Sequence, residues 1–94
     1  NYYKVPTISE WDHDLGVAWF IPREVIKRKT AKGRPYFIVK TIDKNSVMTD
    51  IRCWGVNPEK DKLFVNRPYM AKLNFDEQWG FSSRGALQNW KLLG

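Results

Sequence analysis

The fold is decided by residues 15–56, which read LGVAWFIPREVIKRKTAKGRPYFIVKTIDKNSVMTDIRCWGV. The first residues of this stretch alternate in two sets, Leu15, Val17, Trp19 and Ile21 in one and Gly16, Ala18 and Phe20 in the other. Alternation with period 2 is typical of a half-buried β-strand. Because Pro22 lacks the N–H that a sheet requires, we expect the strand to bend or bulge there before it continues through Val25 and Ile26. A long strand that bends partway allows a short sheet to curl into a barrel.

Two further strands follow within the same stretch. Lys32-Gly33 predicts a turn, because glycine readily adopts positive φ. Residues 36–43 then carry mostly β-branched and aromatic side chains, which favour a strand. A second turn at residues 44–46 leads into a third strand over residues 47–56. Asp43 stands where such a turn needs a side-chain acceptor.

The chain after residue 56 shows weaker patterns. A polar connector over residues 57–62 contains Pro58, which ends the third strand. Two more strands are expected over residues 69–76 and 79–83, joined by a tight turn at Glu77-Gln78.

The two ends of the chain differ from this β pattern. Residues 1–14 have no clear period and are expected to form a lead-in strap, in which Ser9 caps a short helical turn. At the other end, Ala86, Trp90 and Leu93 have helical spacing, which predicts a short C-terminal helix. Of the five tryptophans, Trp19 is the first choice for the core, and Trp11 and Trp90 are expected to clamp the termini.

These elements predict an all-β fold. We expect a small five-stranded antiparallel barrel over residues 15–94, preceded by the strap over residues 1–14. The oligonucleotide/oligosaccharide-binding (OB) barrel fits best, with strands 2 and 3 and the loops between strands 1–2 and 4–5 as its binding face. An SH3-like barrel is the alternative, but its strands are usually shorter than the first strand here.

Composition limits the class of protein. Ninety-four residues, 43% of them hydrophobic, suffice for one domain with one core. No apolar run approaches the roughly 18–20 residues of a membrane span, so a transmembrane segment is not expected. The net positive charge favours an anionic partner, most simply nucleic acid, and an anionic membrane surface would also satisfy it, although no membrane partner is predicted. The single cysteine, Cys53, cannot form an intrachain disulfide, which fits a reducing cytoplasmic setting. The chain begins at Asn1 without a Met or a signal-like segment, and we expect it to be a piece of a longer protein.

Charge is concentrated in one part of the chain. The formal net charge is +6, and seven of the sixteen Lys and Arg residues lie between Arg23 and Lys40, where Glu24 is the single acid. Cations that follow a phosphate backbone, next to rings on which bases stack, are typical of single-stranded nucleic-acid binding. The candidate binding residues are Tyr36, Lys40, Arg52, Trp54, Lys27, Arg28, Lys29, Lys32 and Arg34.

The direction of the side chains decides which of these residues share a face. Neighbours on a strand point to opposite sides, and Lys40 is far easier to solvate than to bury. We therefore expect Phe37, Val39 and Thr41 to face inward, with Ile51 and Cys53 beside them on the third strand. The outward set is then Tyr36, Ile38, Lys40, Met48, Asp50, Arg52 and Trp54. The opposite parity, and a structural role for Trp54 at the barrel end, are the alternatives.

The fifth strand adds three residues to this prediction. Trp79, Phe81 and Arg84 are expected to extend the outward set around the barrel.

A resemblance to a known family supports the barrel. Residues 32–43, KGRPYFIVKTID, and residues 51–55, IRCWG, resemble the OB-fold module of bacterial-type (C-family) replicative DNA polymerase alpha subunits and the anticodon-binding domains of class II tRNA synthetases. The resemblance covers residues 15–56 and implies a nucleic-acid-binding barrel. These families commonly have glycine a few residues after the Asp, so here Asn45 is expected to supply the left-handed turn position. Trp54 and the basic loop suit a single-stranded template better than an anticodon, which favours the polymerase module.

The sequence therefore predicts a non-catalytic domain that binds single-stranded DNA, with RNA as a second ligand class, within a longer polypeptide such as a DNA polymerase. A protein–protein docking barrel and a tRNA anticodon-binding domain are the alternatives. No catalytic constellation is evident, because Cys53 has no nearby base and Asp43 and Asp50 form no persuasive acid–base pair. Asp12-His13-Asp14 lacks the spacing of a metal site, and no cofactor is expected.

Overall fold

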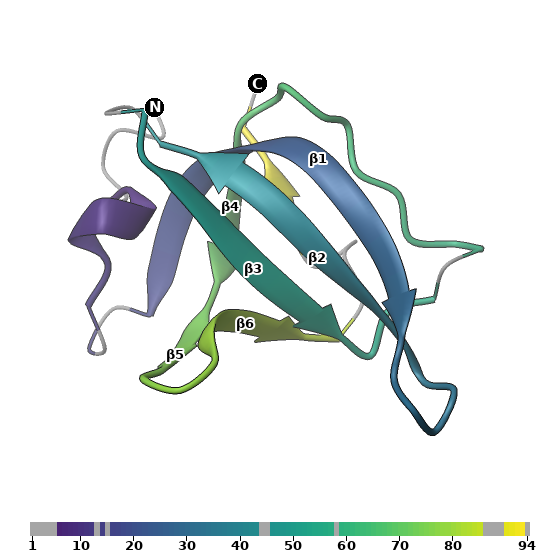
Figure 1. Cartoon of the computed structure of the whole chain (residues 1–94). Coiled ribbons are helices and arrows are strands. Elements are labelled where there is room, and N and C mark those ends of the chain that lie inside the picture. The colour runs from purple at the N-terminus through teal and green to yellow at the C-terminus, as the bar shows by residue number, and fades with distance from the viewer. Residues whose placement is uncertain are drawn as a thin grey trace.

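The computed structural model describes residues 6–12, 14, 16–43, 46–57, 59–85 and 90–93. Strands dominate these residues, which confirms the predicted all-β class (Figure 1). The elements are a 3₁₀ helix (Ile8–Glu10), β1 (Val17–Lys29), β2 (Pro35–Ile42), β3 (Met48–Trp54), β4 (Tyr69–Lys72), β5 (Asn74–Asp76), β6 (Gly80–Arg84) and β7 (Lys91–Leu92).

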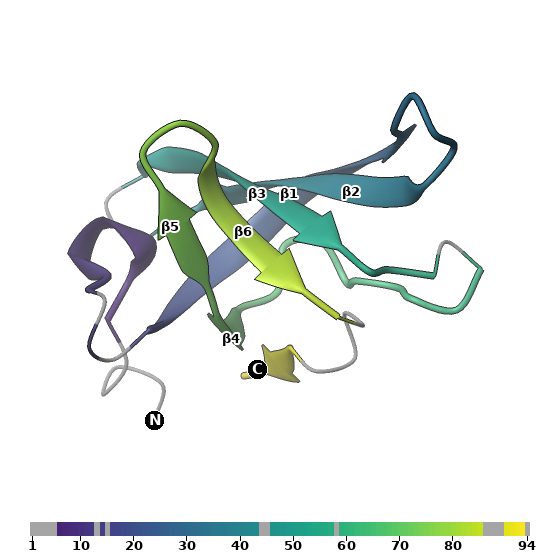
Figure 2. The same cartoon turned by 90° about the horizontal axis from the view of Figure 1, so that it is seen from below.

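The strands form one curled sheet in the order β5-β6-β3-β2-β1-β4-β7. β1, β2 and β3 are consecutive, and β4 returns after a long connection to pair with β1, which is a Greek-key arrangement. β4 and β5 lie far apart in the strand order, although only Leu73 separates them along the chain. The sheet must therefore curl back on itself, and Figures 1 and 2 show β1, β2 and β3 as a twisted layer that crosses β4, β5 and β6.

The bulge predicted in the first strand is present. Pro22 pairs with Thr41, whereas the next pair is Glu24 with Lys40, so Arg23 is an extra residue on β1. An extra residue reverses the facing of everything after it. Pro22 is accordingly buried, Glu24 is exposed, and Val25 lies opposite the buried Val39.

The strand count and one pairing differ from the prediction. The fourth strand, expected to run unbroken over residues 69–76, divides into β4 and β5 at Leu73, whose side chain is buried in the core. β6 pairs with β3 in parallel, so the barrel is not wholly antiparallel. The predicted C-terminal helix is wrong at Lys91–Leu92, which form β7 against β4, and residues 86–89 lie outside the described residues.

The core lies inside the curled sheet. Trp19 is buried as expected, but the central cluster contains its neighbours Ala18 and Phe20 instead. Trp90 closes one end of the core: its ring meets Phe20 edge-on at 5.0 Å between centroids, and its Nε1 donates to Ser83 Oγ at 3.0 Å. The central cluster consists of Ile8, Ala18, Phe20, Phe37, Val39, Ile51, Cys53, Val56, Tyr69, Ala71, Leu73 and Trp90.

The N-terminal segment is tied to the barrel by its own contacts. Its turn is capped by Thr7 rather than by Ser9, because the Thr7 N–H and hydroxyl both donate to the Glu10 carboxylate, at 3.4 Å and 3.1 Å. The Ser9 hydroxyl instead donates to the Asp43 carboxylate. Asp43 also accepts from the Val47 N–H at 3.0 Å, as expected of its turn position.

The turn between β2 and β3 contains a left-handed residue. Ser46 occupies that position with φ 61°. Asn45, the residue expected there, lies outside the described residues.

Candidate nucleic-acid interface

The predicted parity of β2 and β3 is confirmed. Phe37 is 1% exposed and Val39, Thr41, Ile51 and Cys53 are fully buried. The residues between them on each strand are half-buried or exposed, and they form the outer face: Tyr36, Ile38, Lys40, Met48, Asp50, Arg52 and Trp54.

One row of outer residues crosses four neighbouring strands. Arg28 on β1 lies opposite Tyr36 on β2, Tyr36 lies opposite Trp54 on β3, and Trp54 lies opposite Arg84 on β6. Directly paired residues share a face, so we name Arg28, Tyr36, Trp54 and Arg84 the outer row. The Tyr36 and Trp54 rings stack at 4.7 Å between centroids and 28° between planes. They cover one another, so a base can stack on the outer face of either ring but not between them unless they separate.

A second row lies next to the outer row and ends under an exposed ring. Arg52 on β3 lies opposite Ser82 on β6, and Ser82 lies opposite Asn74 on β5. The Arg52 guanidinium lies 5.4 Å from the Trp79 ring centroid, and its Nη1 donates to the Trp79 carbonyl at 2.7 Å. These contacts fix Arg52 beneath Trp79, whose side chain is 61% exposed.

The two rows line a groove of about 840 Å³. Tyr36 and Trp54 come from β2 and β3, and Trp79 comes from the turn between β5 and β6, so aromatic residues from both parts of the sheet line the groove. We call it the groove; it is lined by Tyr36, Arg52, Trp54, Asn74, Phe75, Asp76, Trp79, Ser82 and Arg84.

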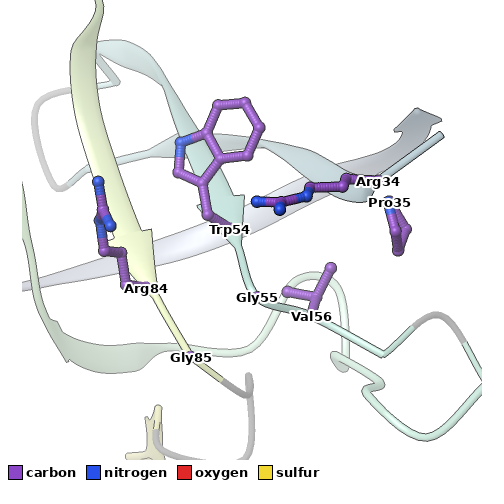
Figure 3. Close-up of a pocket in the computed structure, with 7 residues that line it drawn as sticks. All are labelled: Arg34, Pro35, Trp54, Gly55, Val56, Arg84 and Gly85. Carbon is purple, nitrogen blue, oxygen red and sulfur yellow. The ribbon is translucent and has the colours of Figure 1, made fainter. Parts of the chain in front are cut away.

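Beside the groove lies a smaller hollow of about 400 Å³, which we name the arginine pocket (Figure 3). Trp54 lies between two arginines in this view. Arg84 is on β6 at one side, and Arg34, just before β2, extends toward Trp54 from the other. Neither guanidinium forms an ion pair with a described residue. Gly55 and Gly85 complete the wall, and a Cβ at Gly55 would lie 3.2 Å from the Gly85 nitrogen. Two unpaired cations beside a ring are suited to an anion that carries an aromatic group.

The remaining predicted cations, all lysines, do not lie in the outer row or the arginine pocket. Lys27 lies opposite Phe37 and Lys29 opposite Pro35, so both are on the face away from the outer row. Lys27 Nζ is 5.8 Å from the Phe37 ring centroid. Lys32 lies in the exposed loop of the β1–β2 hairpin, which projects beyond β6 in Figure 2. Lys40 lies farther along the outer face, 3.9 Å from Asp50.

Of the three residues expected to extend the outward set, two lie on the groove and one faces inward. Trp79 and Arg84 line the groove, as expected. Phe81 instead faces inward, where its ring lies 5.3 Å from that of Trp11 and 5.0 Å from that of Phe75. Asn74, Asp76 and Ser82 were not foreseen, because only the parallel pairing of β6 with β3 brings them beside Arg52.

The one thiol of the chain, Cys53, is buried. Burial raises the pKa of the Cys53 thiol to about 12, which leaves it protonated and unreactive near neutral pH. No three His, Cys, Asp or Glu side chains in the described part of the chain cluster as metal ligands would, and His13 lies outside that part. None of the described helices has the length and apolar character to cross a membrane.

Comparisons with protein-family models, with curated proteins and with solved structures found no match to this chain.

Proposed function

We propose that this chain is a non-catalytic OB-type barrel that binds single-stranded nucleic acid, with DNA as its preferred ligand. The observation that carries the proposal is the outer row, in which two stacked, half-buried rings lie between two arginines. Single-stranded binding requires flat rings for unpaired bases and cations for the backbone, and the outer row offers both on one face.

The strand arrangement supports the OB assignment. If β4 and β5 are counted as one strand broken at Leu73, and the two-residue β7 is set aside, five strands form the curled Greek-key sheet. The OB-fold is a five-stranded Greek-key barrel that binds oligonucleotides on strands 2 and 3 and in the loops between strands 1–2 and 4–5. Here those parts are β2, β3, the basic hairpin loop and the turn that carries Trp79.

The proposed mechanism separates affinity into two terms. Bases stack on the outer faces of Tyr36 and Trp54, while Arg28, Arg34 and Arg84 contact phosphates. Stacking is tolerant of sequence because every base has a flat face, and phosphate contacts carry no sequence information. Duplex DNA is a poor ligand for this surface because its bases are already stacked on one another.

The wider setting is proposed from the sequence resemblance. The parent polypeptide is a cytoplasmic replicative DNA polymerase of the bacterial type, and this domain binds its single-stranded template. An anticodon-binding role differs in the preferred ligand, so competition between DNA and RNA oligonucleotides of one sequence separates the two settings.

The direct test measures binding of a fluorescein-labelled oligo(dT) of about twelve nucleotides, within the range of OB-fold site sizes. We expect Trp54→Ala to weaken binding about tenfold, because loss of one stacking ring costs roughly 1–3 kcal/mol. Phe64→Ala is the control, since Phe64 is an aromatic side chain on the surface, 65% exposed, that lines neither the groove nor the arginine pocket.

Two outcomes would contradict the proposal. One is the absence of any oligonucleotide affinity at low salt. The other is an equal loss of affinity in Trp54→Ala and Phe64→Ala. Either result favours a docking barrel for a protein partner, in which the exposed rings of Trp79 and Phe75 form the contact surface.

A further inference from the structure

Three polar residues that line the groove are not used by the proposed function. We call Asn74, Asp76 and Ser82 the floor of the groove. Asn74 lies directly opposite Ser82, and both line the groove beside Arg52. The Asn74 amide and the Ser82 hydroxyl form no hydrogen bond with the described residues. Their donors and acceptors are therefore available to a ligand in the groove.

Asp76 adds an acceptor at the end of this floor. Its Oδ1 is occupied by the β5–β6 turn, where it accepts from the N–H groups of Gln78 at 2.7 Å and Trp79 at 3.1 Å. Its Oδ2 has no partner in the described part of the chain, and Asp76 lines the same groove. An ionised carboxylate accepts hydrogen bonds and cannot donate one. It therefore favours a ligand edge that presents N–H groups and disfavours one that presents a carbonyl oxygen.

The position of this floor relative to the rings indicates which base would reach it. Asn74 lies two strands across from Arg52, and Trp54 is two residues farther along β3, so Asn74 and Trp54 are about 12 Å apart at the usual strand spacings. A base at Asn74 therefore belongs to the same short stretch of single strand as the base stacked on Trp54. Trp79, fixed over Arg52 and largely exposed, offers this second base a ring of its own.

We propose that Asn74, Asp76 and Ser82 form a base-selective site that prefers adenine, cytosine and guanine, which carry an exocyclic amino group, over thymine and uracil. The site rests on the proposed function, because only a bound single strand brings a base to this floor. The chemistry follows known pairings: a carboxylate accepts from cytosine N4, and an asparagine amide pairs with the adenine edge through two hydrogen bonds. Guanine offers a carboxylate its N2 amino group and the ring N–H beside it. Thymine and uracil have no exocyclic amino group: they place a carbonyl oxygen where cytosine and adenine place theirs, and that oxygen cannot pair with Asp76.

The experiment compares oligo(dC) with oligo(dU), each of about twelve nucleotides, by fluorescence anisotropy near neutral pH. The two probes have the same length, charge and sugar, and they differ in the hydrogen-bonding edge of the base. We expect oligo(dC) to bind at least about fivefold more tightly than oligo(dU).

Variants then locate the selectivity. Asn74→Ala and Ser82→Ala should bring the ratio of the two affinities toward one, as should Asp76→Asn, which keeps an oxygen for the turn. Trp54→Ala should weaken binding of both probes and leave the ratio unchanged, because a ring face does not distinguish their edges. Near-UV circular dichroism on each variant confirms that the barrel is folded.

The failures of the two proposals are distinguishable. Equal affinities of oligo(dC) and oligo(dU) for the wild-type domain would overturn base selectivity and leave single-stranded binding intact. A ratio that persists in Asn74→Ala, Ser82→Ala and Asp76→Asn would also overturn the assignment to this floor. If neither probe binds at low salt, the proposed function itself is wrong, and the selectivity falls with it.

Discussion

The Cys53 thiol lies in the centre of the barrel, beside Phe37 on the neighbouring strand. Burial raises its pKa from 9.0 to about 12, because the charged thiolate loses its hydration there. The unfolded chain therefore ionises first as pH rises, and the stability contributed by the neutral thiol is present below pH 9 and lost between pH 9 and about 12.

This titration gives a testable pH dependence. Between about pH 8 and about pH 10.5, the wild-type domain should lose about 2 kcal/mol more stability than Cys53→Ala does. Denaturant unfolding of both proteins across this range measures the difference, and lysine and tyrosine titrations are common to both. Parallel pH profiles for the two proteins would contradict the burial of this thiol.

Single residues also show how far sequence reasoning extends to the site. The facing of Tyr36, Arg52 and Trp54 could be predicted, because burying Lys40 would cost far more than solvating it. The stacking of Tyr36 on Trp54 could not, since it depends on the register between β2 and β3. Asn74 and Ser82 gave no signal at all, because each is an ordinary polar residue until β5 and β6 are placed beside Arg52.

At the scale of the element, β1 depends on a single extra residue. Arg23 is the bulge that turns Glu24 outward and Val25 inward. Deletion of Arg23 leaves the pairs on either side, Pro22 with Thr41 and Glu24 with Lys40, but removes the extra residue that bends and twists β1 where the sheet curls. Because the core depends on that curl, we expect a loss of about 2 kcal/mol, which lowers the Tm of a domain of this size by about 8–16 °C.

The control for this deletion is Arg23→Ala, which removes the same side chain and keeps the backbone of the bulge. Because Arg23 is exposed, Arg23→Ala should change the free energy of unfolding by less than about 0.5 kcal/mol. Thermal unfolding followed by circular dichroism distinguishes the two variants. A deletion as mild as the substitution would mean that the curl of the sheet does not depend on the bulge.

The elements that sequence reasoning found and missed differ in the range of their contacts. β1, β2 and β3 are joined by short turns, and Pro22 and Gly33 mark the bulge and the first turn directly. β7 was mistaken for part of a helix because the spacing of Trp90 and Leu93 fits one, whereas its pairing with β4 is a tertiary contact. The break at Leu73 has the same origin: it follows from closure of the sheet, which no local pattern encodes.

For the whole molecule, the question is whether nucleic-acid affinity follows total charge or its placement. Arg84 belongs to the outer row, whereas Lys91 is an exposed residue on β7 that lines neither the groove nor the arginine pocket. Replacing either cation by glutamate subtracts two from the formal net charge of +6 and gives +4. Arg84→Glu and Lys91→Glu are therefore matched in total charge and differ in position.

We expect Arg84→Glu to weaken binding of oligo(dT) at least about tenfold and Lys91→Glu to weaken it less than about threefold, because screening confines these interactions to about 10 Å at moderate salt. Affinity measured over a salt series provides the second readout. Each lost phosphate contact reduces the slope of log K against log salt by about 0.7 for a single strand, so the slope should fall in Arg84→Glu and stay constant in Lys91→Glu. Equal effects of the two variants on affinity and slope would show that the domain attracts nucleic acid through its net charge alone, without a defined binding face.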